Sequence, residues 1–174
     1  MNTGRYEIRK ALPDDLEFLP VIEQRASEIF LDTPFADEVS QECLSIELLS
    51  QQLDAGRLWV AVEDTGHPVG FAVAIMIDGA AHLHEVSVDP DHGKRGLGRK
   101  LVEAVCLWAK HTGYPVVTLS TFRDVPWNAP FYEQLGFVQL TDPQLTPGLR
   151  KLRDEEKEAG LDISARILMR RSLQ

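Results

Sequence analysis

The sequence predicts an α/β fold in which helices flank a mixed, mostly antiparallel sheet. The length of 174 residues suits one domain, spanning residues 1–174, since domains cluster at about 100–150 residues. The hydrophobic share of 44% and the charged share of 26% are ordinary for a chain that buries a sizeable core. Along the chain the apolar period changes from alternation to helical spacing and back, which is typical of alternating strands and helices.

The first half of the chain predicts a strand, two helices and a meander of three antiparallel strands. Residues 6–12 favour a short strand, and Pro13 opens a helix whose apolar residues recur at helical spacing as far as Ala26. Thr33-Pro34-Phe35 ends that helix, and a second helix is expected over residues 40–53. The three strands are expected at 58–63, 69–77 and 81–88, with Asp78-Gly79 as a hairpin signal.

The second half predicts helices at 97–113 and 127–135 around a buried strand at 115–120. Leu97, Leu101, Val105 and Trp108 form one face of the first helix, and Gly136 is expected to end the second. Residues 137–140 resume extended structure, 141–148 form a loop, and the charged segment 149–159 is expected to be a solvated helix. A final strand is expected at 163–169.

The net charge of −9 argues against nucleic-acid binding, which needs clustered Lys and Arg, and is compatible with a cationic substrate. Residues 1–5 lack the apolar core of a secretory signal, and the longest apolar run, 69–77, is far below the ~20 residues of a membrane helix. We therefore expect a cytoplasmic protein without a membrane partner. Cys43 and Cys106 show no metal-ligand spacing, so no metal is expected.

A glycine-rich turn, residues 93–98, joins the strand at 81–88 to the helix at 97–113. Backbone amides in such a turn, continuing into a helix N-terminus, favour a phosphate group. A Walker A loop would need Ser or Thr after its Lys, whereas Arg99-Lys100-Leu101 follows Gly98. A dinucleotide-binding turn fits poorly as well, because Leu101 stands where that motif has Gly or Ala and the preceding strand belongs to an antiparallel meander.

The turn resembles the acetyl-CoA pyrophosphate loop of the GCN5-related N-acetyltransferases (GNAT), whose pattern is Q/R-x-x-G-x-G/A. Gly93 departs from the Gln/Arg position. The segment Asn128-Ala129-Pro130-Phe131-Tyr132 with Leu135-Gly136-Phe137 is similar to the late signature of the same family. The resemblance implies a GNAT-like sheet in which the strand before the loop and its neighbour at 115–120 splay apart and pantetheine inserts between them. It also implies that acetyl-CoA is bound by these residues: Val86, Ser87, Val88, Gly93, Lys94, Arg95, Gly96, Leu97, Gly98, Arg99 and Asn128.

Proton transfer to and from the reactants needs an acid and a base. Tyr132 matches the family tyrosine near the coenzyme A sulfur and is the candidate acid. His82 and His84 lie on one face of their strand, and this His-x-His pattern is similar to the arylalkylamine N-acetyltransferases, where such a pair serves as base. Glu85 stands where other members of the superfamily carry a glutamate base. The sequence leaves all three residues open.

The resemblance implies an N-acetyltransferase that transfers acetyl directly to a primary amine, with a small molecule as the favoured acceptor. A protein N-terminus or lysine is the alternative acceptor, and a non-catalytic coenzyme A-binding regulatory module is the alternative function. Phe30 and Phe35 are expected to pack on the acceptor, and Glu28 or Asp32 to attract its charge. Many relatives are dimers, so a homodimer is among the assemblies the resemblance allows.

Overall fold

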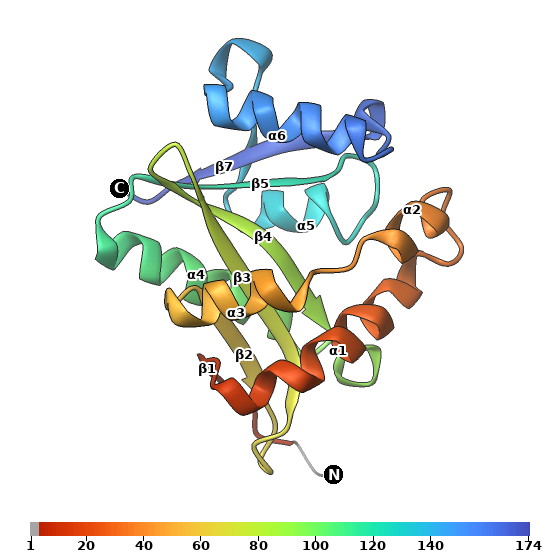
Figure 1. Ribbon diagram of the computed structural model, residues 1–174, viewed down its shortest axis with the longest axis vertical. Coiled ribbons are helices and arrows are strands. Elements are labelled where there is room, and N and C mark those ends of the chain that lie inside the picture. Colours follow the sequence, from red (N-terminus) through yellow and green to blue (C-terminus); the bar gives the residue numbers. More distant parts are fainter. Residues whose placement is uncertain (1–3) are drawn as a thin grey trace. The chain divides into compact units, whose positions relative to one another are not determined.

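Seven strands form one mixed sheet in the computed structural model, which describes residues 4–174 (Figure 1). The strands are β1 (Glu7–Lys10), β2 (Leu58–Val62), β3 (Pro68–Ile77), β4 (Ala80–Val88), β5 (Val116–Phe122), β6 (Val138–Gln139) and β7 (Arg166–Ser172). Their order in the sheet is β1-β2-β3-β4-β5-β7-β6. The β4–β5 pairing is parallel, whereas the β1–β2, β2–β3, β5–β7 and β6–β7 pairings are antiparallel. The predicted α/β fold with a mixed, mostly antiparallel sheet is confirmed.

The helices fall between these strands in the chain. They are α1 (Leu19–Ala26), α2 (Ala36–Gln41), α3 (Ile46–Asp54), α4 (Leu97–Thr112), α5 (Ala129–Gln134) and α6 (Pro147–Glu158). Short 3₁₀ turns are Pro13–Phe18, Ser27–Phe30, Pro90–His92, Asp142–Gln144 and Ile163–Ala165. Within residues 4–174, no helix combines the length and apolar composition needed to cross a membrane.

Tertiary contacts divide the chain into two compact units, and β3, β4 and α4 contribute to both. One unit contains the described residues up to 74 together with 85–105, and the other contains 75–84 and 106–174. The assignment of residues 1–174 to a single domain stays a prediction.

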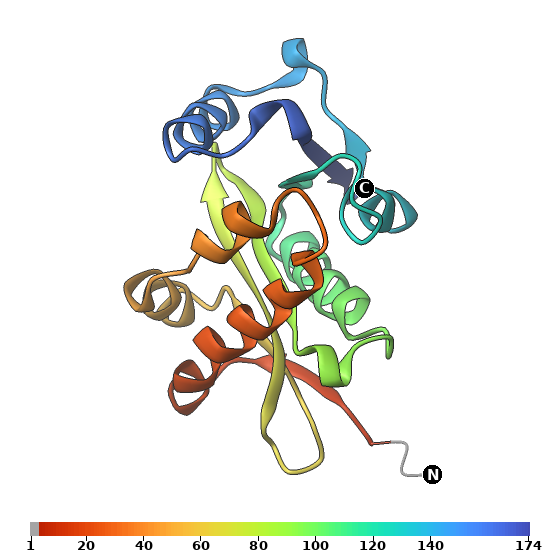
Figure 2. The same cartoon turned by 90° about the vertical axis from the view of Figure 1, so that its right-hand side faces the viewer.

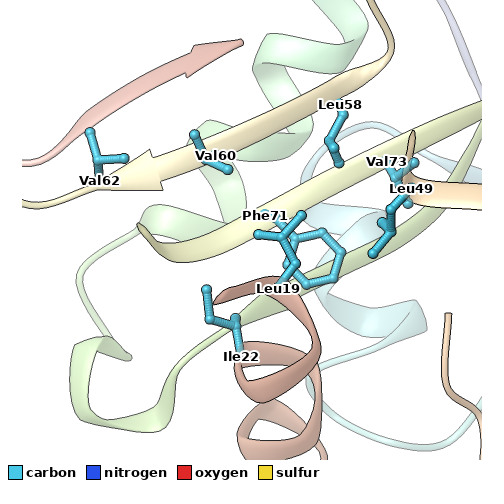
Figure 3. Close-up of a cluster of buried hydrophobic side chains, with 8 residues drawn as sticks. All are labelled: Leu19, Ile22, Leu49, Leu58, Val60, Val62, Phe71 and Val73. Atoms are coloured by element: carbon cyan, nitrogen blue, oxygen red, sulfur yellow. The ribbon is translucent and has the colours of Figure 1, made fainter. Parts of the chain in front are cut away.

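The core of the first unit lies where α1 and α3 pack on β2 and β3 (Figure 3). Its buried members are Leu19, Ile22, Leu49, Leu58, Val60, Val62, Phe71 and Val73. On β2 the alternate residues 58, 60 and 62 share a face, as strand geometry requires. The apolar residues that recur at helical and strand spacing in the sequence thus pack together in one cluster.

The predicted helix over residues 40–53 is wrong in its first part. α2 ends at Gln41, and Glu42 is already extended, with φ −78° and ψ 102°. A new helix starts after Ser45, whose Oγ accepts the N–H of Leu48 at 3.1 Å. An N-cap serine satisfies an amide that has no partner inside the helix, so the chain forms two short helices here.

In the second unit, α6 runs alongside β7 (Figure 1), and the view turned by 90° shows the helix nearly end-on (Figure 2). Leu149 of α6 is buried against Leu140, Leu145 and Leu168, and Leu152 packs on the same cluster. The segment predicted as a solvated helix therefore has one apolar face in a core. The predicted last strand begins three residues later than expected, at Arg166, because Ile163–Ala165 forms a 3₁₀ turn capped by the Asp162 carboxylate.

Candidate functional site

The glycine turn follows β4 through a short 3₁₀ turn that is capped by Asp89. The Asp89 carboxylate accepts the N–H of Asp91 at 2.9 Å, and the N–H of Gly93 donates to the carbonyl of Pro90 at 3.1 Å. The chain then reaches α4, where the N–H of Lys100 donates to the carbonyl of Gly96 at 3.1 Å. The amides of Leu97, Gly98 and Arg99 precede this bond, so the helix itself supplies them no acceptor. This is the donor set that a phosphate group requires.

Backbone conformation explains part of the glycine pattern. Gly96 has φ +76°, and a Cβ added there would meet no atom within 4 Å. Lys94 adopts φ +58°, a left-handed conformation that is uncommon for a residue with a side chain. Gly93 has φ −67°, but its Cβ would lie 3.2 Å from the Pro90 carbonyl oxygen. A Gln or Arg at position 93 would therefore require a small shift of that carbonyl.

The positive side chains predicted at the turn are exposed. Lys94, Arg95 and Arg99 all lie at the surface. The guanidinium carbon of Arg95 lies 5.7 Å from the centroid of the Tyr6 ring, within the range of a cation–π contact. The Tyr6 hydroxyl is in turn 2.8 Å from Nδ1 of His92. The residue before β1 thus contacts the 3₁₀ turn Pro90–His92, which precedes the glycines.

The strand end before the turn is tightly packed. Ser87 is buried, and its Oγ donates to a Glu85 carboxylate oxygen at 3.0 Å, whereas Val86 and Val88 are half-buried. Gly70 of β3 lies against this strand: its Cβ would be 3.0 Å from the Ser87 carbonyl oxygen and 3.3 Å from Val88 Cγ2. No sequence pattern singles out Gly70, because the close approach depends on the neighbouring strand.

The two candidate histidines share a strand face but not an environment. Their ring centroids are 6.5 Å apart, as the i, i+2 spacing predicts. His82 is 2% exposed, and its Nδ1 lies 2.8 Å from Thr118 Oγ1 of β5. Burial, with a smaller contribution from the charge of His84, lowers the pKa of His82 to about 3. Burial also lowers the pKa of His84, which is half-buried. Both rings are thus neutral at pH 7.

Tyr132 and Asn128 come from the segment that begins α5. The Tyr132 ring meets Phe131 and Phe137 edge-on, with centroids 5.1 and 5.8 Å apart, and its N–H donates to the Asn128 carbonyl at 3.0 Å. The Asn128 side-chain oxygen Oδ1 is buried and has no hydrogen-bond partner within residues 4–174. A buried acceptor without a donor is costly, and a bound ligand bearing an N–H or O–H would satisfy it.

The predicted acceptor residues differ in exposure. Phe30 is buried and Phe35 half-buried, whereas Glu28 and Asp32 are exposed. Thr33 fixes the connection between them: its Oγ1 donates to the Phe30 carbonyl at 2.7 Å and accepts the N–H of Phe35 at 3.2 Å. In the part of the chain that the structure describes, no group of His, Cys, Asp and Glu could hold a metal ion.

Sequence reasoning missed Arg25, on the last turn of α1. Its Nε lies 3.2 Å from Asp89 Oδ2, and its Nη2 lies 2.9 Å from Asp91 Oδ2. These carboxylates precede the glycine turn (Figure 1, light green). No local pattern links a helix arginine to acids so distant in sequence, so only the tertiary contact identifies it.

Comparisons with known proteins identify the family of the chain. A sequence profile of the acetyltransferase (GNAT) family matches residues 22–137. The peptidyl-lysine N-acetyltransferase YjaB of Salmonella typhimurium is 31% identical over 133 residues, covering 75% of this chain and 81% of that protein. The S-(2-succino)cysteine N-acetyltransferase of Bacillus subtilis is 34% identical over 76 residues, covering 40% of this chain and 44% of that protein.

One solved structure with this fold is PaiA N-acetyltransferase from Thermoplasma acidophilum in complex with coenzyme A. It superimposes with a TM-score of 0.66 at 18% sequence identity, and the match covers 97% of this chain and 99% of that one. At this identity the likeness concerns the fold.

Proposed function

Because the chain belongs to the acetyltransferase (GNAT) family and is an N-acetyltransferase, we propose that it transfers the acetyl group of acetyl-CoA directly to a primary amine of a small molecule. The observation that supports acetyl-CoA as the cosubstrate is the glycine turn. At Gly96 the backbone is left-handed with open space beside it, and amides of the first turn of α4 follow directly. Acetyl-CoA supplies an activated thioester, whose carbonyl carbon is the electrophile.

Two features of the chain fit this cosubstrate. The amides of Leu97, Gly98 and Arg99 would hold the diphosphate, with Lys94 and Arg95 adding positive charge. The unsatisfied Oδ1 of Asn128 would accept a hydrogen bond from an amide or hydroxyl of the bound molecule. Val86, Ser87 and Val88 remain our candidates for backbone contacts along the pantetheine.

A pair of glycine substitutions tests the turn. Gly96 and Gly66 have φ of +76° and +83°, and at neither would a Cβ meet an atom within 4 Å. Alanine should therefore cost each site a similar backbone strain of about 1–2 kcal/mol. We expect Gly96→Ala to weaken acetyl-CoA binding about tenfold by calorimetry, since the methyl group enters the space beside the diphosphate. Gly66→Ala is the matched control, and equal affinities of the two variants would remove the turn from the site.

For the base we favour His84 over His82 and Glu85. A histidine base must be unprotonated before it accepts the proton of the amine, and burial, which lowers the pKa of His84, favours that form. His82 is deeper, is fixed by Thr118, and has a pKa of about 3, so it is a poor proton acceptor near neutrality. Glu85 is engaged by the Ser87 hydroxyl. We assign the acid role to the Tyr132 hydroxyl, which would protonate the departing thiolate.

The acceptor is proposed to contact the segment that includes Phe30 and Phe35. The half-buried ring of Phe35 would contact an apolar part of the amine, and exposed Glu28 and Asp32 would offer negative charge for its ammonium form. Phe30 is 9% exposed and would act mainly by supporting this segment.

A lysine side chain is the second candidate acceptor, because a peptidyl-lysine N-acetyltransferase is 31% identical over three quarters of the chain. A thiol-release assay with acetyl-CoA over small amines, amino acids and lysine peptides separates the two. We expect kcat/KM to be highest for a small amine. Turnover confined to lysine peptides would overturn that choice, and binding of acetyl-CoA without turnover of any acceptor would contradict the mechanism.

A further inference from the structure

We propose that Arg25 strengthens acetyl-CoA binding at the turn, because its positive charge offsets part of the negative charge of the two carboxylates that precede the turn. This inference rests on the proposed cosubstrate. It adds a residue outside the turn, on helix α1, to the groups that determine cofactor affinity.

The contact geometry shows one guanidinium bridging two acids. Nε of Arg25 lies 3.2 Å from Asp89 Oδ2, and Nη2 lies 2.9 Å from Asp91 Oδ2. Nε is buried and has no hydrogen-bond partner within residues 4–174, so its contact with Asp89 is an ion pair without a hydrogen bond. The side chain of Asp89 is 19% exposed and that of Asp91 is 73% exposed, so Arg25 spans from the packed end of β4 to the surface of the turn. The planar fork of arginine suits this bridge better than the single ammonium of lysine.

Asp89 is the fixed point of this arrangement. Its N–H donates to the Val69 carbonyl at 2.8 Å, and its Oδ1 accepts the N–H of Asp91 at 2.9 Å. The backbone of the turn therefore leaves the sheet at a residue whose carboxylate is held by a cap and an ion pair together. Arg25 completes that set from α1.

The ion pairs of Arg25 affect ligand binding through their charge. A turn that binds a diphosphate must present positive potential, yet the chain has a net charge of −9 and places two aspartates directly before the glycines. Uncompensated carboxylates within about one Debye length, ~10 Å at 0.1 M salt, would repel the phosphates. By pairing with both, Arg25 reduces this repulsion.

The same 3₁₀ turn has a second attachment that does not involve charge neutralisation. The Tyr6 hydroxyl lies 2.8 Å from His92 Nδ1, and the two rings meet edge-on. Loss of the Arg25 side chain thus leaves the turn tethered through His92. The consequence of that loss should be electrostatic, and removal of a carboxylate should relieve it.

The test compares Arg25→Gln, Arg25→Lys, Asp91→Asn and the double variant Arg25→Gln/Asp91→Asn. We expect Arg25→Gln to raise the KM for acetyl-CoA on the order of three- to tenfold at low ionic strength, with kcat little changed. The double variant should recover most of that loss, Arg25→Lys should recover part of it, and added salt should shrink the difference between Arg25→Gln and the unchanged protein. Calorimetric binding of coenzyme A should show the same order.

Arg9→Gln provides the matched control. Arg9 pairs with Asp15 at 2.7 Å in the same unit, at β1 and the turn after it, so its loss should change the free energy of unfolding and leave the KM for acetyl-CoA unaltered. An unchanged KM in Arg25→Gln would overturn the proposal. A raised KM that Asp91→Asn does not lower would also overturn it, because Arg25 would then act only through structure. Failure of the unchanged protein to bind acetyl-CoA would instead refute the proposed function, and the inference with it.

Discussion

Burial of His82 predicts that the protein loses stability as the pH falls below 7. The ring is 2% exposed, and its pKa drops from 6.5 to about 3 on folding, chiefly by burial and secondarily through the charge of His84. Because the pKa is lower in the folded state, the unfolded chain binds the proton first. The contribution of His82 is therefore fully present above pH 6.5 and is lost as the pH falls toward 3.

The size of the loss follows from the shift. Each pH unit below 6.5 removes about 1.4 kcal/mol, so at pH 5 the native state should be about 2 kcal/mol less stable than at pH 8 on account of His82 alone. His84, whose pKa burial also lowers, changes stability in the same direction. The perturbation is His82→Asn, which retains a polar group opposite Thr118 and does not titrate.

Urea unfolding gives the free energy of unfolding at pH 8 and pH 5, and the change between the two pH values is compared for the unchanged protein and the variant. Between these pH values we expect the unchanged protein to lose about 2 kcal/mol more than His82→Asn, whatever the absolute stability of the variant. The control is His111→Asn, the same substitution at an exposed histidine on α4. If His82→Asn shows the full pH dependence of the unchanged protein, the argument from burial is refuted.

Two other variants address the second unit. Gly148→Ala should destabilise the fold by about 1–3 kcal/mol in urea unfolding. The added Cβ would lie 2.6 Å from both Asp78 carboxylate oxygens and 2.7 Å from Ile77 Cγ2, and it would disturb the 2.7 Å hydrogen bond from the Gly148 N–H to Asp78. An unaltered urea midpoint would contradict this. Tyr132→Phe should lower kcat about a hundredfold in the thiol-release assay while acetyl-CoA affinity is kept, with Tyr114→Phe as the matched control, and an undiminished kcat would exclude the Tyr132 hydroxyl as the acid.

The fold could be predicted wherever the apolar pattern was long. Alternation and helical spacing identified the central strands and α4, since these elements bury one face or both along their whole length. The stretch around Ser45 was misread because Leu44, Leu48 and Leu49 continue a helical spacing across a break. There the serine cap outweighs the pattern: its side chain satisfies an amide that a continuous helix would pair through the backbone.

The candidate site likewise contains residues that a sequence pattern reveals and residues that only a tertiary contact reveals. The glycine turn and the Tyr132 segment are each one continuous stretch of sequence, so motifs could single them out as candidates. Arg25 and Gly70 could not be found in this way, because each matters through a neighbour brought close by folding: the carboxylates beyond β4 for Arg25, and the Ser87 carbonyl for Gly70.

For the two histidines, the sequence predicts a shared strand face but not how deeply each ring is buried. Strand periodicity places His82 and His84 on one face, and the ring separation of 6.5 Å agrees. Periodicity cannot say how deep each ring lies. The parallel pairing with β5 sets His82 opposite Thr118, where burial makes protonation costly, while His84 lies two residues closer to the strand end that leads to the glycine turn. Two residues that a sequence pattern treats as equivalent are thus separated by burial, and it is this difference that leads us to favour His84 as the base and to assign His82 to stability.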